Sequence, residues 1–192
     1  MIRLFIALVP GEAVRQAASD AARALRAAAG GAGRAVRWSS PGVNVHLTLA
    51  FLGEVEAARR PAVEQALAEA ASAAPAPLDL TLEGAGGFPS SRHPRVLWLG
   101  VGGDLAGLSS LQAALARALA ARGLPGARDR FSPHLTIGRS RSPRGAAGLT
   151  PALATPLPRV AWRVAELVLF ESRLGHGPAV HLPLARAPLG ST

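Results

Sequence analysis

A four-residue pattern that joins His and Thr occurs twice, as His46-Leu47-Thr48-Leu49 and as His134-Leu135-Thr136-Ile137. Side chains on a β-strand alternate between two faces, so His and Thr point one way and the apolar residues point the other. Each copy therefore predicts a strand with one face in the core and one polar face left open. The two histidines lie 88 positions apart in a chain of 192 residues. This spacing favours two similar halves that each contribute one motif strand to a shared central cleft.

The segments around these motifs alternate between strand and helix patterns. Apolar runs bounded by Gly and Pro predict strands, over residues 2–9, 43–52, 78–83, 95–101, 130–139, 164–172 and 179–185. Ala-rich and Leu-rich segments with helical spacing predict helices, over 12–29, 60–74 and 105–122, the last with Asp104 as its N-cap. We expect Gly53 to end the second strand, 84–94 to be a loop and the Pro-rich stretch 140–158 to be a surface excursion. Interleaved helices and strands place the chain in the α/β or α+β class.

Composition limits the kind of protein. Hydrophobic residues make up 49% of the chain, enough for a packed core, so 1–192 is expected to be a single domain made of two lobes. The chain has no Cys, which excludes disulfides, thiolate nucleophiles and Cys-ligated metals and agrees with a cytoplasmic location. The apolar run 2–9 is too short to span a bilayer and is interrupted by Arg3, so a buried strand is the better interpretation.

The charge of the chain has two explanations. There are 21 basic residues, all of them Arg, against 12 acidic residues, for a formal net charge of +9. Such an excess favours polyanionic partners, and the planar fork of Arg donates paired hydrogen bonds to phosphate oxygens. A chain this rich in Ala, Arg, Gly and Pro is also what a GC-rich coding sequence produces. Charge alone therefore does not decide the function.

Two histidines suit the hydrolysis of a phosphodiester. Imidazole has an unperturbed pKa near 6.5, so one ring can be neutral while the other is protonated at neutral pH. The neutral ring takes a proton from the attacking water, the protonated ring supplies one to the leaving oxygen, and Thr hydroxyls can donate to the phosphate. Each His could instead be structural, and each Thr could reflect β propensity. No His-x-x-His, His-Glu-x-x-His or acidic cluster lies near either motif, so we expect no metal.

Four blocks of the chain, in this order, resemble the 2H phosphoesterase superfamily, and within it the RNA 2′,3′-cyclic phosphodiesterases formerly named 2′-5′ RNA ligases. These blocks are Arg3–Ala7, Asn44–Gly53, Arg95–Gly100 and Arg130–Arg139. The resemblance implies a bilobal, pseudo-two-fold α+β fold in which antiparallel sheets line a central cleft with helices outside. It also implies the opening of a terminal 2′,3′-cyclic phosphate of RNA to a 2′-phosphomonoester, without a cofactor. In that family assignment His46 is the proton donor to the leaving 3′ oxygen and His134 is the proton acceptor that activates water. The sequence alone leaves the two roles interchangeable.

Residues outside the His-Thr pairs are weaker candidates for binding the substrate. Arg130 corresponds to a basic position of the family and could hold phosphate, and Arg139 is a similar candidate. Both could instead be solvated surface arginines. Phe51 could stack on a base, as could Phe5 and Trp98, although packing in the core explains each of these aromatic residues as well.

The other three histidines, His93, His176 and His181, have no Thr two positions later and are expected to be structural or at the surface. Of these, His181 is expected to come nearest to the cleft. We expect the protein to be a monomeric enzyme that binds no membrane and whose partner is an RNA end. Slow 2′-5′ ligation would be the reverse of the same reaction. Two alternatives remain open: action on a small nucleotide such as ADP-ribose cyclic phosphate, and an RNA-end-binding module without turnover.

Overall fold

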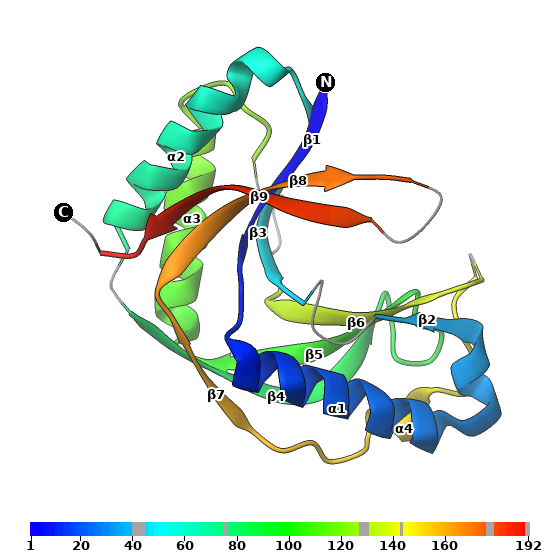
Figure 1. The fold of residues 1–192 in the computed structure, drawn as a ribbon. Coiled ribbons are helices and arrows are strands. Elements are labelled where there is room, and N and C mark those ends of the chain that lie inside the picture. The colour runs from blue at the N-terminus through cyan, green and yellow to red at the C-terminus, as the bar shows by residue number, and fades with distance from the viewer. Residues whose placement is uncertain (40–44, 75–76, 127–130, 143, 176–178, 191–192) are drawn as a thin grey trace.

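The strands of the chain form two antiparallel sheets in a computed structural model, which describes residues 1–39, 45–74, 77–126, 131–142, 144–175 and 179–190. Figure 1 shows the two sheets one above the other. The first sheet contains, in spatial order, β3 (Leu47–Val55), β1 (Ile2–Leu8), β8 (Glu166–Arg173) and β9 (Val180–Pro188). The second contains β2 (Val36–Trp38), β6 (His134–Ser140), β5 (Val96–Gly103), β4 (Leu78–Phe88) and β7 (Val160–Val164). The two motif strands, β3 and β6, therefore lie in different sheets.

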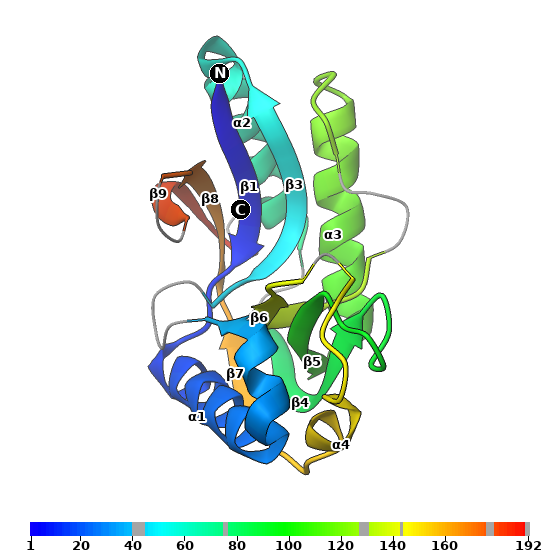
Figure 2. The ribbon, with the colours of Figure 1, turned by 90° about the vertical axis from the view of Figure 1, so that its right-hand side faces the viewer.

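Helices cover the outer sides of the two sheets. The helices α2 (Arg60–Ser72) and α3 (Leu105–Ala120) pack beside the first sheet, and α1 (Glu12–Ala29) and the short α4 (Thr150–Leu153) pack beside the second (Figures 1 and 2). Short 3₁₀ turns follow α1 at Gly30–Ala35 and precede α2 at Ala57–Arg59. Among the described residues, no helix is long and apolar enough to cross a membrane.

The chain ties the two sheets together by crossing between them. The helix α1 follows β1 of the first sheet but covers the second, and α3 follows β5 of the second sheet but packs with α2 on the first. One connected hydrophobic cluster includes side chains from both sheets and from all four of these helices. The two sheets are therefore held by a shared core, which fixes β3 and β6 relative to each other.

Several predicted elements are confirmed. The first helix has the predicted bounds, and its apolar residues Val14, Ala18, Ala21 and Leu25 are buried, because they recur on one helical face. The Asp104 carboxylate caps α3 by accepting a hydrogen bond from the Gly107 N–H at 2.8 Å. The α+β class with antiparallel sheets is confirmed as well.

Two glycines that were expected to end strands lie inside them. The predicted end of a strand at Gly53 is wrong, because β3 continues to Val55 and Gly53 has a φ of +69° at an irregularity in the pairing with β1. The predicted loop over 84–94 is wrong in its first part, because β4 runs to Phe88 through a register shift at Gly84, whose φ is +61°. A positive φ costs Gly little, so these residues bend a strand without ending it.

Three further predictions are wrong or incomplete. The segment 140–158 is not a surface excursion, because its described part includes α4 and buries Ala146, Leu149 and Leu153. The predicted strand 164–172 joins parts of two strands, since the chain leaves the second sheet after Val164 and enters the first at Glu166. The short strands β2 and β7 were not predicted. Residues 43–44 of the predicted second strand lie outside the described residues, and Val45 and His46 precede β3.

Candidate active site

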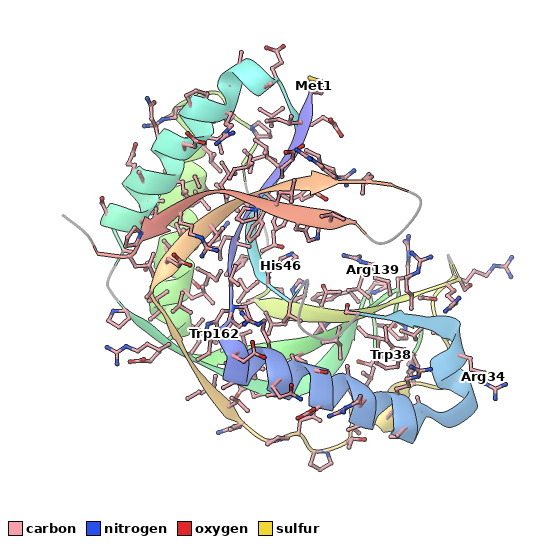
Figure 3. All side chains as sticks on the ribbon, in the orientation of Figure 1. Met1, Arg34, Trp38, His46, Arg139 and Trp162 are labelled. Atoms are coloured by element: carbon pink, nitrogen blue, oxygen red, sulfur yellow. The ribbon has the colours of Figure 1, made fainter. Side chains whose placement is uncertain are left out.

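The first motif has the alternation that its sequence predicts. His46 stands directly before β3, and His46 and Thr48 are half-buried, whereas Leu47 and Leu49 are buried in the core. The second motif repeats this pattern at the start of β6, where His134 and Thr136 are half-buried and Leu135 and Ile137 are buried. We call the face that carries His and Thr the inner face of each strand. Since β3 and β6 lie beside each other, the two His-Thr pairs belong to neighbouring strands of different sheets, and Figure 3 shows His46 between the sheets.

A β-bulge follows the Thr of the first motif. Thr48 pairs with Ala7 of β1 and Ala50 pairs with Ile6, so Leu49 is the additional residue and both Leu49 and Ala50 point into the core. Simple alternation would place Phe51 on the core side, but the bulge returns it to the inner face. Phe51 is accordingly exposed, at 49%, and the Arg3 guanidinium carbon lies 5.0 Å from the centre of its ring.

The second motif has a bulge at the same place. Thr136 pairs with Trp98 of β5 and Gly138 pairs with Leu97, so Ile137 is the additional residue. The bulge returns Arg139, which is exposed, to the inner face of β6, and Figure 3 shows it on the side of β6 that faces the first sheet. Phe51 and Arg139 thus occupy equivalent positions, three residues after the Thr of each motif. The structure thus places two of the three predicted binding residues, Phe51 and Arg139, on the same strand faces as the His-Thr pairs.

His46 packs in a group of rings from the first sheet. Its ring centroid lies 4.9 Å from that of Phe5, 5.3 Å from that of His181 and 6.4 Å from that of Phe170. Phe5 stacks on Phe170 at 5.1 Å and meets His181 edge-on at 4.9 Å. These contacts restrict the positions that the His46 ring can adopt, since buried aromatic side chains pack closely.

His134 is oriented by its own backbone. Its Nδ1 lies 2.7 Å from the carbonyl oxygen of Ser132, and a carbonyl can only accept a hydrogen bond. Nδ1 therefore carries the proton in the neutral ring and Nε2 is left with a lone pair. Phe88 meets the His134 ring edge-on, with 5.0 Å between the ring centroids, and the centroid of the Trp98 ring lies 6.5 Å from that of His134.

The surroundings of His134 favour the neutral ring. Burial lowers the pKa of His134, the hydrogen bond to Ser132 raises it, and the positive charge of Arg139 lowers it further, with burial the largest effect. The net direction is downward from the ordinary value. A neutral imidazole with an oriented Nε2 lone pair is what a general base requires at neutral pH.

His181 contacts the ring of His46, in agreement with the expectation that it approaches the cleft, although the contact itself was not predicted. It lies on β9, where it pairs with Ser172, and its ring contacts both Phe5 and His46. Its Nδ1 is buried with no hydrogen-bond partner among the described residues, and burial lowers its pKa. The lowered pKa favours a neutral His181 ring, so His181 places no positive charge beside His46. No local sequence pattern predicts the contact of His181 with His46, because it is the pairing of β9 with β8 that brings His181 to the site.

The remaining predicted residues are elsewhere or outside the described ranges. Arg130 and His176 lie outside them. His93 is exposed in the turn between β4 and β5, as expected for a surface histidine. Phe5 is buried and Trp98 is half-buried, each packed against a motif histidine or its neighbours. In the described ranges, no three His, Asp or Glu side chains are grouped so that they could hold a metal ion.

Comparison with known proteins identifies the family that this chain resembles. A family model described as the 2′-5′ RNA ligase superfamily matches residues 12–176. An RNA 2′,3′-cyclic phosphodiesterase of Geobacillus stearothermophilus is 34% identical over 153 residues, which is 77% of this chain and 48% of that protein. Relatives of the same name from Aeropyrum pernix and Aquifex aeolicus are covered over 61% and 55% of their lengths. The chain therefore spans about half to three fifths of these relatives.

Solved structures match over almost the whole chain. The protein TT0787 of Thermus thermophilus has a TM-score of 0.75 and 28% identity, and the match covers 98% of both chains. Escherichia coli LigT in complex with 3′-AMP has a TM-score of 0.74 and 29% identity, and the match covers 99% of both chains. The arrangement of sheets and helices is thus one that these proteins share.

Proposed function

The chain belongs to the 2′-5′ RNA ligase superfamily, and from this membership we propose that it opens the terminal 2′,3′-cyclic phosphate of RNA to a 2′-phosphomonoester. The observation that carries the proposal is the pair of bulged His-x-Thr strands, one from each sheet, which lie beside each other. The names of the relatives and the 3′-AMP complex of Escherichia coli LigT support a nucleotide phosphate as the substrate. We further propose that the protein acts as a monomer in the cytoplasm.

His134 is the proton acceptor in the proposed reaction. Its Nδ1–H is held by the Ser132 carbonyl, so Nε2 can take a proton from water as the water oxygen attacks phosphorus. Burial keeps the ring neutral, and therefore ready to accept, at neutral pH. His46, from the opposite sheet, is the proton donor to the 3′ oxygen as the bond between phosphorus and that oxygen breaks.

The two protons balance the reaction. Water supplies the new oxygen on phosphorus and one proton to His134, and His46 supplies one proton to the departing oxygen, which leaves a 3′ hydroxyl and a 2′-phosphate. An acid and a base must act on opposite sides of phosphorus in such a displacement, and two facing strands can supply them. The Thr48 and Thr136 hydroxyls, on the same inner faces, donate to the non-bridging oxygens. None of these steps uses a metal ion.

End-group analysis tests this proposal. An oligoribonucleotide with a 2′,3′-cyclic phosphate end is incubated with the protein in EDTA, and ³¹P NMR identifies the phosphate of the product. We expect a 2′-phosphate, and we expect His46→Ala and His134→Ala each to lower kcat by about 10²–10⁴-fold. His93→Ala is the matched control, because His93 is exposed in a turn outside the site.

The outcomes separate the remaining alternatives. Salt-sensitive binding of the RNA with no turnover by the wild-type protein would identify a binding module instead of an enzyme. Full activity of both His46→Ala and His134→Ala would refute the two-histidine mechanism. Loss of activity in EDTA that added metal restores would refute the metal-independent step.

A further inference from the structure

Two arginines lie directly opposite each other at the edge of the second sheet. Arg37 of β2 pairs with Arg139 of β6 in the antiparallel register, and both side chains are exposed. The Cβ atoms of such a pair lie about 4.5–5.5 Å apart, and like charges in this arrangement destabilise a sheet. An anion bound between the two guanidinium groups would remove that repulsion.

Both arginines belong to the inner face of this sheet. On β2, Val36 is buried and the Trp38 indole donates to the Gly33 carbonyl at 3.0 Å, so these two side chains take the opposite face and Arg37 takes the inner one. Figure 3 shows Trp38 on the side of the sheet away from Arg139. The charge of Arg139 also reaches His134, whose pKa it helps to lower. The pair is therefore continuous with the active site.

The arginines at this end of the sheet are not neutralised by acids. Arg141 follows two residues after Arg139, and Arg95 precedes β5, where its carbonyl accepts from the Ser140 N–H at 2.9 Å. Across the described ranges, none of these four arginines forms an ion pair. Seven other arginines do: Arg15, Arg23, Arg60, Arg122, Arg159, Arg173 and Arg186. Other described arginines also have no ion pair, but here four of them lie on adjacent strands and strand ends beside His134, which favours an anionic ligand there.

We propose that Arg37 and Arg139 bind the phosphate group on the 5′ side of the terminal nucleotide, so that the site takes an RNA chain in preference to a nucleoside cyclic phosphate that has no 5′ phosphate. This inference rests on the proposed function. Arg139 is three residues beyond Thr136 on the same face, about 7–10 Å along a strand. That distance is comparable with the step from the cyclic phosphate to the 5′ phosphate of the same nucleotide. Guanidinium groups bind such phosphates through paired hydrogen bonds.

Three substrates that differ by one group at a time test the proposal: adenosine 2′,3′-cyclic phosphate, the same compound with a 5′-phosphate, and the dinucleotide with a 2′,3′-cyclic phosphate end. We expect the wild-type kcat/KM to be higher for the two substrates that carry the 5′ phosphate. We expect Arg37→Gln to reduce that preference, measured as the ratio of kcat/KM values, by about five- to thirtyfold. For the dinucleotide, the slope of log kcat/KM against the logarithm of the salt concentration should be less negative by about 0.7 in Arg37→Gln than in the wild-type protein.

Arg117→Gln is the matched control. Arg117 is exposed on α3, away from the site, and its substitution removes one positive charge, as Arg37→Gln does. It should leave the preference and the salt slope as they are in the wild-type protein. Urea unfolding adds a second readout: Arg37→Gln should be at least as stable as the wild-type protein, because it removes a like-charge pair.

Two results would overturn the inference in distinguishable ways. If the wild-type protein opens all three substrates with equal kcat/KM and Arg37→Gln changes none of the ratios, the inference fails while the proposed function stands. If the wild-type protein opens none of the three, the proposed function fails and the inference fails with it.

Discussion

Gly86 of β4 lies directly opposite Trp98 of β5, and the indole ring occupies the space that a side chain at position 86 would need. A Cβ atom there would lie 2.9 Å from Cε2 of Trp98 and closer still to Cζ2 and Cη2. Carbon atoms normally approach to about 3.5–4.0 Å, so the overlap is at least roughly 0.6 Å. The ring cannot move without disturbing Phe88, whose centroid lies 5.2 Å away and whose ring meets His134 edge-on.

The substitution Gly86→Ala should therefore destabilise the protein and disturb its site. Overpacking of this kind costs about 1–3 kcal/mol and replacing Gly in a strand offsets this by about 0.5–1 kcal/mol, so the middle of each range leaves a net loss of about 1 kcal/mol. In the Trp98→Leu protein the overlap is absent, and the same substitution should cost nothing or stabilise slightly. Urea unfolding followed by circular dichroism measures the four free energies of this double-mutant cycle. Displacement of Phe88 and His134 should also lower kcat of Gly86→Ala by about ten- to a hundredfold.

Two results would refute this reasoning. Wild-type stability of Gly86→Ala would mean that the indole does not lie against Gly86. An equal loss of stability in the wild-type and Trp98→Leu backgrounds would mean that the loss comes from the backbone and not from the ring.

Three further predictions concern single contacts. Arg139→Gln should raise the pKa of His134, since the guanidinium charge lowers that pKa, but burial should still keep the pKa below its ordinary value. NMR titration of the His134 ring measures the change, and an unchanged or lowered pKa would contradict the prediction. His181→Ala should lower kcat about tenfold by loosening His46, whereas His181→Phe, which keeps a ring there, should retain most of it; equal losses would show that ring packing is not the cause. Asp104→Ala should lower the free energy of unfolding by about 0.5–2 kcal/mol in urea, because it removes the cap of α3, and no loss would contradict this.

The polar faces of the two motif strands could be predicted from the sequence. Strand alternation places His46 with Thr48 and separates them from Leu47, and the burial of these residues agrees. The helices could be predicted for the same kind of reason, since a period of 3.6 residues is a local property.

The bulges could not be predicted from that alternation. One additional residue in each motif strand inverts the faces beyond it, so a strict period of two puts Phe51 and Arg139 in the core. The sequence does repeat the relevant spacing, because Phe51 and Arg139 each stand three residues after the Thr of a motif. Only the pairing with β1 and β5 shows what that spacing means.

The partners of the site residues depend on contacts between distant parts of the chain. His181 reaches His46 because β9 pairs with β8 and β8 with β1. Arg37 reaches Arg139 because the three-residue strand β2 pairs with β6. Strand order of this kind is set by the packing of the whole core, and no local pattern around residues 37 or 181 encodes it.

The division of roles between the two histidines can be tested by changing the leaving group. In a substrate whose 3′ bridging oxygen is replaced by sulfur, the departing thiolate needs little help from a proton donor. We predict that this substrate restores most of the kcat lost in His46→Ala and little of that lost in His134→Ala, because His46 supplies the proton to the leaving group and His134 activates water. Equal restoration of the two variants, or restoration of His134→Ala alone, would contradict the proposed acid and base.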